Sequence, residues 1–443
     1  MSRLFGTDGV RGVANRDLTP DLALTLGRAA GLVLAPDGAE MVVGRDTRVS
    51  GPMLEGALVA GLCSAGVNVR LAGVIPAPAL AFLTVDHVAQ AGAVVSASHN
   101  PVADNGIKFF SDEGMKIPTE VEDEIEGHML EPVKDLPVGT DVGSATVLED
   151  AYERYVEHLV ASVEQSLDGL DIVVDCAHGA GWRAAPEALR RSGARVVAIN
   201  DDPDGARINV DCGSTSLDDV AHAVRAEGAH LGLALDGDGD RVLAVDEHGD
   251  AIDGDRIIGM LALRLFERHR LTNNVVVVTV MSNLGFRRAL EHSGIDVVAA
   301  PVGDRFVAEA MVANGAVLGG EQSGHVIFGD YATTGDGILT GLQIAQAVAS
   351  ADAPLSGLAT FFEPFPQVLI NVPVSAKDGL EQAESLWADV ARAEESLGGD
   401  GRVLVRPSGT EPVVRVMVEA SDSSLGRTLA EDLARSVRRH LGP

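Results

Sequence analysis

The sequence predicts an α/β protein with three similar α/β domains in tandem, followed by a smaller C-terminal α+β domain. Short Val- and Ile-rich runs alternate with longer segments of helical period, and this alternation predicts strands that are largely parallel. The same strand–loop–helix–strand pattern occurs three times along the chain. The length of 443 residues agrees, because one domain usually takes roughly 100–200 residues.

Nine short apolar runs are the predicted strands. They span residues 41–44, 67–72, 93–95, 171–175, 195–199, 231–235, 241–246, 275–280 and 296–299. The first, fourth and eighth runs each lead into a small polar loop and a helical segment, after which the next strand follows. We interpret these three units as an internal repeat, although βαβ units resemble one another in any case.

The last part of the chain has a different pattern. Residues 365–374 and 402–419 are predicted strands, and residues 380–397 and 424–441 are predicted amphipathic helices. Changes of pattern near residues 150, 254 and 364 predict four domains. They span residues 1–150, 151–254, 255–364 and 365–443.

The chain is strongly acidic, with 65 acidic and 34 basic residues and a net charge of −31. Such a charge repels nucleic acid and anionic membranes, so we expect neither as a partner. It also repels phosphorylated metabolites. Any phosphate site must therefore be a local basic pocket within an acidic surface.

Cysteine usage and hydropathy predict the compartment. Cys63, Cys176 and Cys212 lie far apart without a Cys-x-x-Cys pair, so we expect no disulfide framework and a reducing environment. The first residues have no apolar signal-peptide core, and no uncharged apolar run reaches the roughly 18 residues of a membrane span. We expect a soluble cytoplasmic protein.

The first of four polar loops has the sequence Ser-Ala-Ser-His-Asn-Pro at residues 96–101. It follows the predicted strand 93–95, so Ser98 stands where open α/β sheets present ligands. His99 is adjacent, and Lys108 follows shortly afterwards. The evidence for a Ser/His hydrolase is weak, because no Gly-x-Ser-x-Gly elbow surrounds the serine. The alternative is a serine turn ended by Pro101.

The second loop places Asp236, Asp238 and Asp240 at alternate positions, separated by glycines and followed by Arg241. On an extended chain these carboxylates point the same way, and the glycines let the chain curve so that they converge. Three carboxylates so close together need raised pKa values or a cation, and hard oxygen ligands select Mg²⁺ or Ca²⁺. An EF-hand is excluded by Arg241 at the glycine position of its sharp turn. A solvated acidic hairpin turn is the alternative.

The third loop, Gly-Gly-Glu-Gln-Ser-Gly-His at residues 319–325, offers Glu321, Gln322, Ser323 and His325 between glycines. Together these side chains donate and accept hydrogen bonds, as sugar hydroxyls require. An ordinary polar turn is the alternative.

The fourth loop spans residues 406–412 and contains guanidinium and hydroxyl groups around a glycine. Such groups form phosphate cradles, although the loop lacks the Gly-Lys-Ser/Thr ending of a Walker A motif. A hairpin loop with surface arginines is the alternative. The candidate residues of the phosphate cradle are Arg406, Ser408, Gly409, Thr410 and the following Arg415.

Two further arginines follow glycines, Arg11 near the N-terminus and Arg305 beyond the strand 296–299. Each is equally explained by a ligand contact or by a structural pair with a carboxylate. Together with the four loops they make up a hydroxyl nucleophile, a metal loop, a polyol-binding loop and a phosphate cradle. That combination fits phosphoryl transfer, in which catalysis is mostly positioning and charge neutralisation.

Five motifs in this order along the chain resemble those of the α-D-phosphohexomutase superfamily. They lie at residues 7–12 (Thr-Asp-Gly-Val-Arg-Gly), 96–101, 236–241, 321–325 and 406–412. The resemblance covers essentially the whole chain. The form Gly-Glu-Gln-Ser-Gly-His at 320–325 is most similar to bacterial members that act on glucosamine phosphates. Members acting on mannose and glucose phosphates more often have Met where Gln322 stands.

The resemblance implies four domains around a central cleft and an isomerase that interconverts glucosamine 6-phosphate and glucosamine 1-phosphate. The reaction would pass through a phosphoserine enzyme and a 1,6-bisphosphate, and the product would feed UDP-N-acetylglucosamine and cell-wall synthesis. Glucose or glucosamine 1,6-bisphosphate would serve as activator or intermediate.

The resemblance also implies a role for each candidate residue. Ser98 would be the phosphoserine and would complete one Mg²⁺ site with Asp236, Asp238 and Asp240. Arg241 would stabilise the transferring phosphoryl group, and Lys108, with His99 and Arg11 nearby, would handle the proton of the attacking hydroxyl. The substrate would be bound by Arg305, Glu321, Ser323, His325, Arg406, Ser408, Gly409, Thr410 and Arg415.

Three alternatives stay open from the sequence. The same chemistry on mannose or glucose phosphates is the closest, and Gln322 argues only mildly against it. A Mg²⁺-dependent sugar phosphatase would share the metal loop and the phosphate cradle, whereas a non-catalytic sugar-phosphate sensor would not need Ser98. The oligomeric state, monomer or homodimer, is not determined by the sequence.

Overall fold

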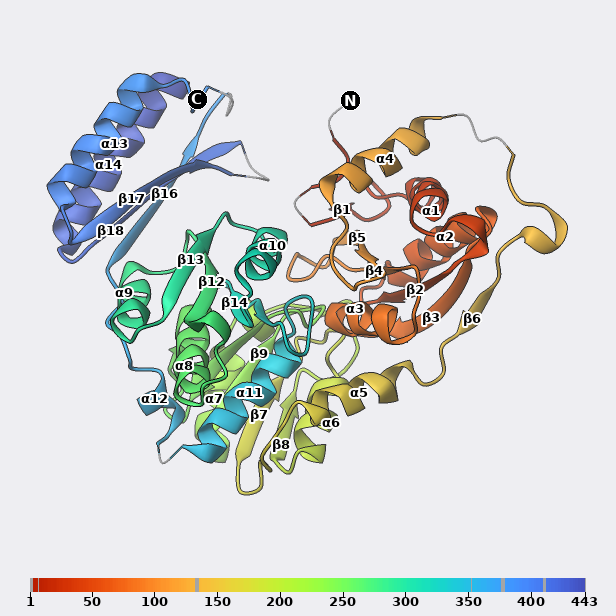
Figure 1. The fold of residues 1–443 in the computed structure, drawn as a ribbon, viewed down its shortest axis with the longest axis horizontal. Helices are drawn as coiled ribbons and strands as arrows, with labels where there is room; N and C mark the ends of the chain where they lie inside the picture. Colours follow the sequence, from red (N-terminus) through yellow and green to blue (C-terminus); the bar gives the residue numbers. More distant parts are fainter. Residues whose placement is uncertain are drawn as a thin grey trace. The chain divides into compact units, whose positions relative to one another are not determined.

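The computed structural model describes residues 3–6, 8–131, 135–351, 353–375, 379–408 and 412–442 (Figure 1). It divides into two compact units. Unit 1 comprises Met1–Met281 with Gly294–Thr360, and unit 2 comprises Ser282–Ser293 with Phe361–Pro443. Each unit has its own helices and its own sheet structure, with three described sheets in unit 1 and one in unit 2.

Unit 1 contains three β-sheets. The first has the strand order β1-β5-β4-β2-β3-β6, the second β11-β10-β9-β7-β8 and the third β13-β12-β14-β15. Their strands are β1 Val10–Val13, β2 Glu40–Arg45, β3 Asn68–Val74, β4 Ala91–Val95, β5 Asp104–Ser111, β6 Ala145–Val147, β7 Asp171–Asp175, β8 Arg195–Ile199, β9 Leu231–Leu235, β10 Val242–Asp246, β11 Ala251–Ile252, β12 Val275–Thr279, β13 Asp296–Ala300, β14 Leu318–Gly320 and β15 Val326–Phe328.

The same four-strand arrangement occurs in all three sheets. The orders β3-β2-β4-β5, β8-β7-β9-β10 and β13-β12-β14-β15 are equivalent, with three parallel strands and an antiparallel fourth. This topology confirms the predicted internal repeat. The prediction of largely parallel strands holds for the centre of each sheet, whereas the outer strands β1, β5, β10, β11 and β15 pair antiparallel.

The central strands form because their residues are β-branched or small and are buried on both faces. In β12 all five residues, Val-Val-Val-Val-Thr, are buried, as is typical of a parallel strand with both faces covered. Each fully buried Val contributes about 1.5–3 kcal/mol through removal of apolar surface from water. The aliphatic cores include Met41 and Leu58 in the first sheet's cluster and Val173 in the second's.

The helices of unit 1 pack against these sheets (Figure 1). Thr19 caps α1 by accepting a hydrogen bond from Leu22 N, and Asp253 caps α8 in the same way. The helices are α1 Pro20–Leu34, α2 Gly51–Ser64, α3 Ala77–Asp86, α4 Thr119–Leu130, α5 Ala151–Ala161, α6 Ala184–Arg191, α7 Asp218–Glu227, α8 Gly254–Glu267, α10 Asp304–Asn314, α11 Gly337–Ser350 and α12 Leu355–Leu358.

Helix α11 is buried along almost its whole length and packs against elements of the second and third sheets. Its N-cap, Asp336, accepts hydrogen bonds from Ile338 N and Leu339 N through Oδ1 and from the Tyr155 hydroxyl through Oδ2. Because Tyr155 belongs to α5, this carboxylate joins two helices that are far apart in the sequence.

Unit 2 is an antiparallel three-stranded sheet with helices on one face. The strand order is β16-β18-β17, and helices α13 and α14 pack on it. The elements are α9 Leu284–His292, β16 Gln367–Pro373, α13 Glu384–Leu397, β17 Gly401–Pro407, β18 Val413–Ala420 and α14 Ser423–Leu441. The prediction of a smaller α+β domain is confirmed. The single predicted strand 402–419 is instead a β17–β18 hairpin.

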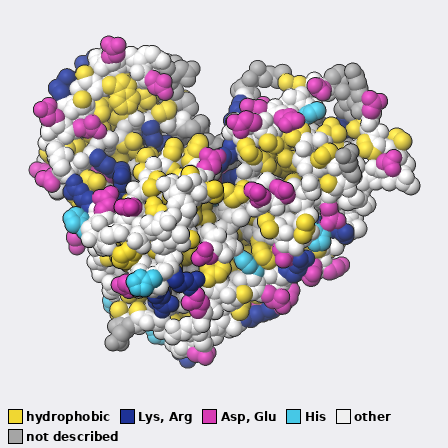
Figure 2. Space-filling view, in the orientation of Figure 1, with side chains coloured by type: hydrophobic (Ala, Val, Ile, Leu, Met, Phe, Trp, Pro, Cys, Tyr) yellow, Lys and Arg dark blue, Asp and Glu magenta, His cyan; other side chains and the backbone are white. Residues whose placement is uncertain are grey.

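On the face drawn in Figure 2, acidic side chains are scattered over the surface rather than gathered in one patch. The large negative charge of the sequence is therefore distributed on this face. Among the residues that the structure describes, no helix is long and apolar enough to cross a bilayer.

Candidate active site

The Ser98 loop connects β4 to β5 in the first sheet. Ser98 is 1% exposed and has a left-handed backbone with φ of 51°. Its hydroxyl donates to Asp236 Oδ2 at 2.5 Å and lies 3.2 Å from His99 Nδ1. The tertiary structure thus joins the serine loop to the acidic loop, two motifs that lie far apart in the sequence.

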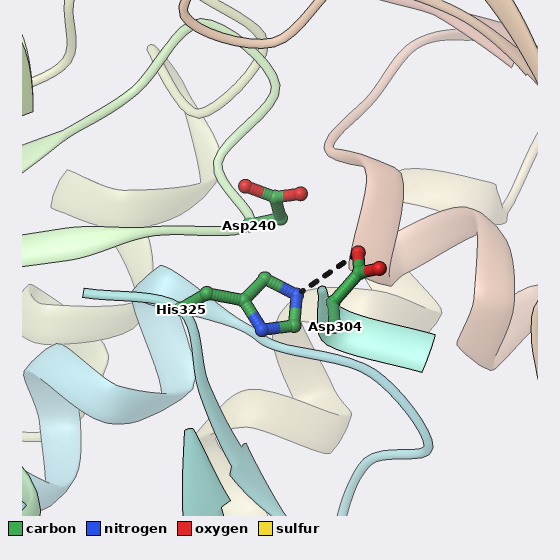
Figure 3. Close-up of side chains that lie close together, drawn as sticks. All are labelled: Asp240, Asp304 and His325. Carbon is green, nitrogen blue, oxygen red and sulfur yellow. Dashed lines mark ion pairs between the residues drawn. The ribbon is translucent and has the colours of Figure 1, made fainter. Parts of the chain in front are cut away.

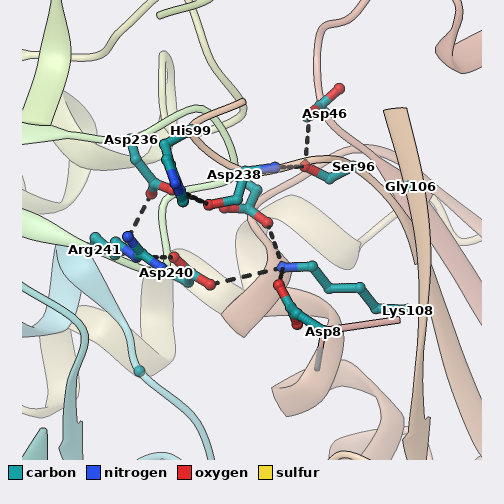
Figure 4. Close-up of polar contacts among 12 residues, drawn as sticks. Asp8, Asp46, Ser96, His99, Gly106, Lys108, Asp236, Asp238, Asp240 and Arg241 are labelled. Atoms are coloured by element: carbon teal, nitrogen blue, oxygen red, sulfur yellow. Dashed lines mark hydrogen bonds and ion pairs between the residues drawn. The ribbon is translucent and has the colours of Figure 1, made fainter. Parts of the chain in front are cut away.

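The acidic loop connects β9 to β10, which is the equivalent position in the second sheet. Asp236, Asp238 and Asp240 are 0%, 0% and 5% exposed, and one oxygen of each lies within 4.8 Å of those of the other two (Figure 4). Gly237 is required here, because a Cβ would lie 2.6 Å from the Ser98 carbonyl oxygen. The predicted convergence of the three carboxylates is therefore observed.

Backbone hydrogen bonds fix the acidic loop from three directions. Gly237 O accepts from Ala180 N at 2.8 Å, Asp238 O from Ala77 N at 2.9 Å, and Gly239 O from Gly337 N at 2.9 Å. These donors lie in the β7–α6 connection and at the starts of α3 and α11. The loop is held by segments associated with all three repeats, which makes the carboxylate geometry a property of the whole unit.

Lys108 on β5 is the main counter-charge of the acidic loop. Its ammonium lies 3.0 Å from Asp238 Oδ2, 3.0 Å from Asp8 Oδ2 and 3.8 Å from Asp240 Oδ2 (Figure 4). Burial alone would lower the pKa of Lys108, but the surrounding carboxylates raise it well above the usual lysine value. Lys108 is therefore a protonated, buried cation in this arrangement.

The three carboxyl groups of the acidic loop have different pKa values. Burial and the nearby Asp240 and Asp238 carboxylates raise the pKa of Asp236 well above its usual range. Burial, followed by the Asp238 carboxylate, likewise raises the pKa of Asp240. For Asp238 the effect of burial is outweighed by Lys108, and its pKa falls to about 2. One lysine thus leaves the negative charge of the loop incompletely neutralised.

This donor set fits a hard divalent cation. Oδ1 of Asp238 and Oδ1 of Asp240 are buried and accept no hydrogen bond from any described residue. Buried carboxylate oxygens without a donor are costly, and a cation would satisfy them. Mg²⁺ prefers oxygen ligands and commonly keeps open positions for water or phosphate oxygens.

His99 lies beside the serine hydroxyl as a neutral ring. Burial, followed by the Arg241 guanidinium, lowers the pKa of His99 to about 4. The ring is therefore uncharged at neutral pH. Arg241 Nε lies 3.8 Å from Asp240 Oδ1. Burial acts to lower the pKa of Arg241, but the adjacent carboxylates raise it above its usual value.

Asp8 is surrounded by several cationic side chains, including Lys108. It forms ion pairs with Arg11, Lys108 and Lys116. These cations hold the pKa of Asp8 well below its usual range although burial acts to raise it. Lys116 also pairs with Asp304, which begins α10. Lys116, which follows β5, is thereby joined to the third repeat directly, and Lys108 is joined to it through Asp8.

The sugar-loop candidates lie between β14 and β15, the equivalent position in the third sheet. Glu321 accepts from Gly303 N at 3.1 Å, and the Ser323 hydroxyl donates to Glu321 Oε2 at 3.2 Å. A backbone hydrogen bond from Val242 N to Gly324 O, at 3.1 Å, joins this loop to β10 beside the acidic loop.

His325 lies between Asp240 and Asp304 (Figure 3). These three side chains could form a second metal-ligand group by distance alone. His325 Nε2 accepts a hydrogen bond from Gly335 N at 3.2 Å, and Lys116 pairs with Asp304. Because both groups already have partners, the acidic loop is the better cation site, and His325 connects it to the sugar loop.

Arg305 lies on α10 and contacts α4 rather than the acidic loop. One of its guanidinium nitrogens donates to Glu122 Oε1 at 2.5 Å and the other to Thr119 Oγ1 at 2.7 Å. Glu122 also pairs with Arg3. The structure therefore gives Arg305 a carboxylate partner in unit 1.

The candidate phosphate cradle lies in unit 2, in the turn of the β17–β18 hairpin. Arg406 and Arg415 are directly opposite each other across the two strands, and an Arg415 nitrogen lies 3.4 Å from Ser408 Oγ. Two arginines at facing strand positions and a hydroxyl are suited to an anion. Gly409 and Thr410 lie outside the described residues.

The structure thus brings Ser98, His99, Lys108, Arg11, Arg241 and the three aspartates together in unit 1, with the sugar loop beside them. Five further residues of this region are not among those that the sequence patterns predicted, namely Asp8, Lys116, Asp304, Arg48 and Asn209. The first three form the ion-pair network at Lys108, and the last two contact the Ser98 loop. Two of the five have a signal in the sequence: Asp8 lies in the N-terminal motif, and Arg48 lies just after a predicted strand. The other three have none.

Comparisons with known proteins identify the family. The domain models of the phosphoglucomutase/phosphomannomutase family match residues 2–134 (α/β/α domain I), 153–249 (domain II), 253–365 (domain III) and 369–436 (the C-terminal domain). The chain belongs to this family. The resemblance predicted from the five motifs is therefore confirmed, as is the fold of three α/β domains and a smaller fourth.

Members of the family with similar sequences share a common name. A phosphoglucosamine mutase of Moorella thermoacetica is 54% identical over 95% of this chain and 96% of its own length. That of Thermobifida fusca is 53% identical over 100% of this chain and 99% of its own length. A solved phosphoglucomutase/phosphomannomutase family protein from Burkholderia thailandensis superposes with a TM-score of 0.85 at 27% identity, covering 99% and 98% of the two chains.

Proposed function

We propose that this chain is a phosphoglucosamine mutase that interconverts glucosamine 6-phosphate and glucosamine 1-phosphate. The observation that carries the proposal is the hydrogen bond from the Ser98 hydroxyl to Asp236 Oδ2, because it puts a buried nucleophile on a three-carboxylate loop suited to a divalent cation. Relatives more than half identical over nearly the full length bear this name. The product would enter UDP-N-acetylglucosamine and cell-wall precursor synthesis.

In the proposed reaction, phosphoserine 98 donates its phosphoryl group to a hydroxyl of the hexosamine monophosphate. The bond between Ser98 Oγ and phosphorus breaks, the sugar oxygen gains the phosphoryl group, and the hydroxyl proton goes to a residue of the site. A 1,6-bisphosphate forms and reorients, and its other phosphate returns to Ser98. Glucose 1,6-bisphosphate would activate the enzyme by the same transfer.

The chain's own residues supply most of the required charge. Asp236, Asp238, Asp240 and the Ser98 side chain would hold one Mg²⁺, which when bound would neutralise phosphoryl charge. Arg241 would stabilise the transferring phosphoryl group from the side of the acidic loop. Arg11 and His99 would stay near the attacking hydroxyl, His99 as a neutral ring.

Lys108 is proposed as a catalytic residue whose charge matters more than its basicity. Its position among Asp8, Asp238 and Asp240 favours the ammonium form, so accepting a proton would require those contacts to change when substrate binds. Bound phosphate is a further anion and would by itself favour the ammonium form as well.

Sugar and phosphate binding are assigned to two separate places. Glu321 and Ser323, with His325, would bind the sugar hydroxyls in either orientation of the bisphosphate. Arg406, Ser408, Gly409, Thr410 and Arg415 would hold the distal phosphate. Arg305 stays in the proposal as a substrate contact that must first leave Glu122.

We further propose four domains at residues 1–150, 151–254, 255–364 and 365–443, working in the cytoplasm as a monomer or homodimer. The three described cysteines are free, as a reducing compartment would leave them.

A turnover assay tests the proposal. Glucosamine 6-phosphate, mannose 6-phosphate and glucose 6-phosphate are supplied at equal concentration with Mg²⁺ and a trace of glucose 1,6-bisphosphate. We expect a clear preference for glucosamine 6-phosphate and no continuous release of inorganic phosphate. A preference for mannose or glucose phosphate would make the chain a phosphomannomutase or phosphoglucomutase of the same family. Steady phosphate release would instead indicate a phosphatase.

A further inference from the structure

Arg48 is a fully buried cation that the chemistry above does not use. It follows β2, is 0% exposed, and pairs through Nε with Asp46 Oδ2 at 3.0 Å. Its two terminal nitrogens donate to four carbonyl oxygens, those of Ser98 (2.8 Å), Asn100 (2.8 Å), Pro101 (2.7 Å) and Asp104 (2.9 Å). A buried charge is costly unless it is fully hydrogen-bonded, and here every partner beyond Asp46 belongs to the segment 98–104.

The Ser98 backbone needs such support because of its conformation. A φ of 51° is uncommon for serine and costs free energy that the surroundings must supply. Ser98 N donates to Ser96 Oγ at 2.9 Å, and Ser96 Oγ donates to Asp46 Oδ2 at 2.6 Å. Asp46 therefore holds the amide side of Ser98 through Ser96, and Arg48 holds its carbonyl side.

A second side chain reaches the same carbonyl from the second repeat. Asn209 lies between β8 and β9, and its Nδ2 donates to Ser98 O at 2.9 Å. Gly237 of the acidic loop approaches that carbonyl closely enough to exclude a Cβ. The Ser98 peptide is thus fixed between its own sheet and the segment that carries the metal-loop carboxylates.

We propose that Arg48 and Asn209 are positioning residues for phosphoryl transfer to and from Ser98. They hold the Ser98 carbonyl so that the left-handed backbone aims Oγ at the acidic loop. The guanidinium N–H groups of Arg48 are all donated to Asp46 and to four carbonyl oxygens, which leaves none for a sugar phosphate and separates its effect from substrate binding. The inference rests on the proposed function, because it concerns the serine that would carry the phosphoryl group.

The test measures phosphorylation of Ser98 directly. Enzyme of known starting phosphoserine content is mixed with Mg²⁺ and saturating glucose 1,6-bisphosphate, quenched at intervals, and analysed by intact mass. The amplitude of the time course gives the fraction of molecules that can be phosphorylated at Ser98. The rate constant reports how well Ser98 is positioned for the transfer. The variants are Arg48→Lys, which keeps the charge but loses the planar fork, and Asn209→Gly, which accepts the φ of 58° at that position.

We expect the rate constant to fall about 100-fold in Arg48→Lys and about tenfold in Asn209→Gly, since small misplacements of reacting atoms have effects of this size. The KM for glucosamine 6-phosphate should stay within about twofold of wild type, because neither side chain binds substrate. Arg70→Lys is the matched control, an arginine on β3 of the same sheet that pairs with Glu40. Its rate constant and KM should equal those of wild type.

A purely structural role predicts a lower amplitude or melting temperature with an unchanged rate constant, and that outcome would overturn the inference. So would a raised KM at unchanged kcat. If Arg48→Lys does not fold, Asn209→Gly decides by the same criteria. If wild-type enzyme takes up no phosphate at Ser98, the proposed function fails and the inference fails with it, whereas normal wild-type uptake with unaffected variants overturns the inference alone.

Discussion

Ser98 Oγ donates a hydrogen bond to Asp236 Oδ2 at 2.5 Å across a sequence separation of 138 residues. The serine belongs to the first repeat and the aspartate to the second. Because Asp236 is also one of three converging carboxylates, the hydroxyl proposed to carry phosphate and the loop proposed to bind Mg²⁺ are in contact within the protein alone. Replacing either side chain should therefore affect both phosphoryl transfer and metal binding.

Ser98→Ala should abolish mutase turnover, with a loss of at least about 1,000-fold, because it removes the phosphoryl acceptor. Mass spectrometry should detect phosphate on the Ser98 peptide of the wild-type enzyme and none on the corresponding peptide of the variant. Ser166→Ala, at an exposed serine, serves as control and should keep full activity. Normal turnover by the Ser98→Ala variant would rule out a phosphoserine mechanism.

Asp240→Asn should raise the Mg²⁺ concentration needed for half-maximal activity by about tenfold or more. The substitution removes a charge from the three-carboxylate group and replaces one of two oxygens, of which Oδ1 now accepts no hydrogen bond from the described residues. The measurement is a Mg²⁺ titration of turnover after removal of metal with a chelator. Asp250→Asn, an exposed aspartate beyond β10, should leave the titration unchanged. The same midpoint in both variants would exclude the acidic loop as the metal site.

Lys108→Arg should keep turnover within about tenfold of wild type, whereas Lys108→Met should lose about 1,000-fold. The three surrounding carboxylates raise the pKa of Lys108, so its charge is what the site requires and arginine preserves it. Steady-state kcat of the two variants at saturating substrate gives the comparison. Equal, severe losses in both would instead favour Lys108 as the proton acceptor.

Gln322→Met should shift the substrate preference towards mannose and glucose phosphates. The Gln322 amide donates to Asp253 Oδ2 at 3.3 Å, a contact that methionine cannot make, so the sugar loop keeps only its backbone hydrogen bond from Gly254 N to Gln322 O at the start of α8. The ratio of kcat/KM for glucosamine 6-phosphate to that for mannose 6-phosphate should fall by about tenfold. An unchanged ratio would mean that Gln322 does not determine the sugar preference.

Helix α11 should lose stability as pH rises from 4 to 7. Burial raises the pKa of Asp336 from 3.8 to about 6, so in this range the folded protein binds more protons than the unfolded chain, and stability falls with increasing pH. The shift corresponds to about 3 kcal/mol. Hydrogen exchange of the Ile338 and Leu339 amides, which donate to Asp336, reports the local free energy.

Asp336→Asn is the matched variant, because asparagine also caps helices but does not titrate. After correction for intrinsic exchange rates, the pH dependence seen in wild type should be absent from this variant. An identical dependence in both proteins would show that another group titrates.

The predicted strands at residues 171–175, 195–199 and 231–235 match β7, β8 and β9, because buried parallel strands are continuous Val/Ile/Leu/Ala runs that contrast with their surroundings. Strands β5, β14 and β15 were not predicted. Residues 104–111 begin with Asp-Asn-Gly and include Lys108, so no apolar run marks β5. Strands β14 and β15 have only three residues each, and they form because β12 pairs with β14 and β14 in turn pairs with β15.

The sequence by itself determined the repeat, the four polar loops and the chemistry of each, because these depend on residue types and spacings within short segments. Only the tertiary structure decided that three of those loops occupy the same position in equivalent sheets, each joining a parallel strand to its antiparallel neighbour. It also decided that Lys108 is surrounded by carboxylates and that Arg305 pairs with Glu122. Such pairings join residues a hundred or more positions apart, and they are set by sheet packing rather than by local pattern.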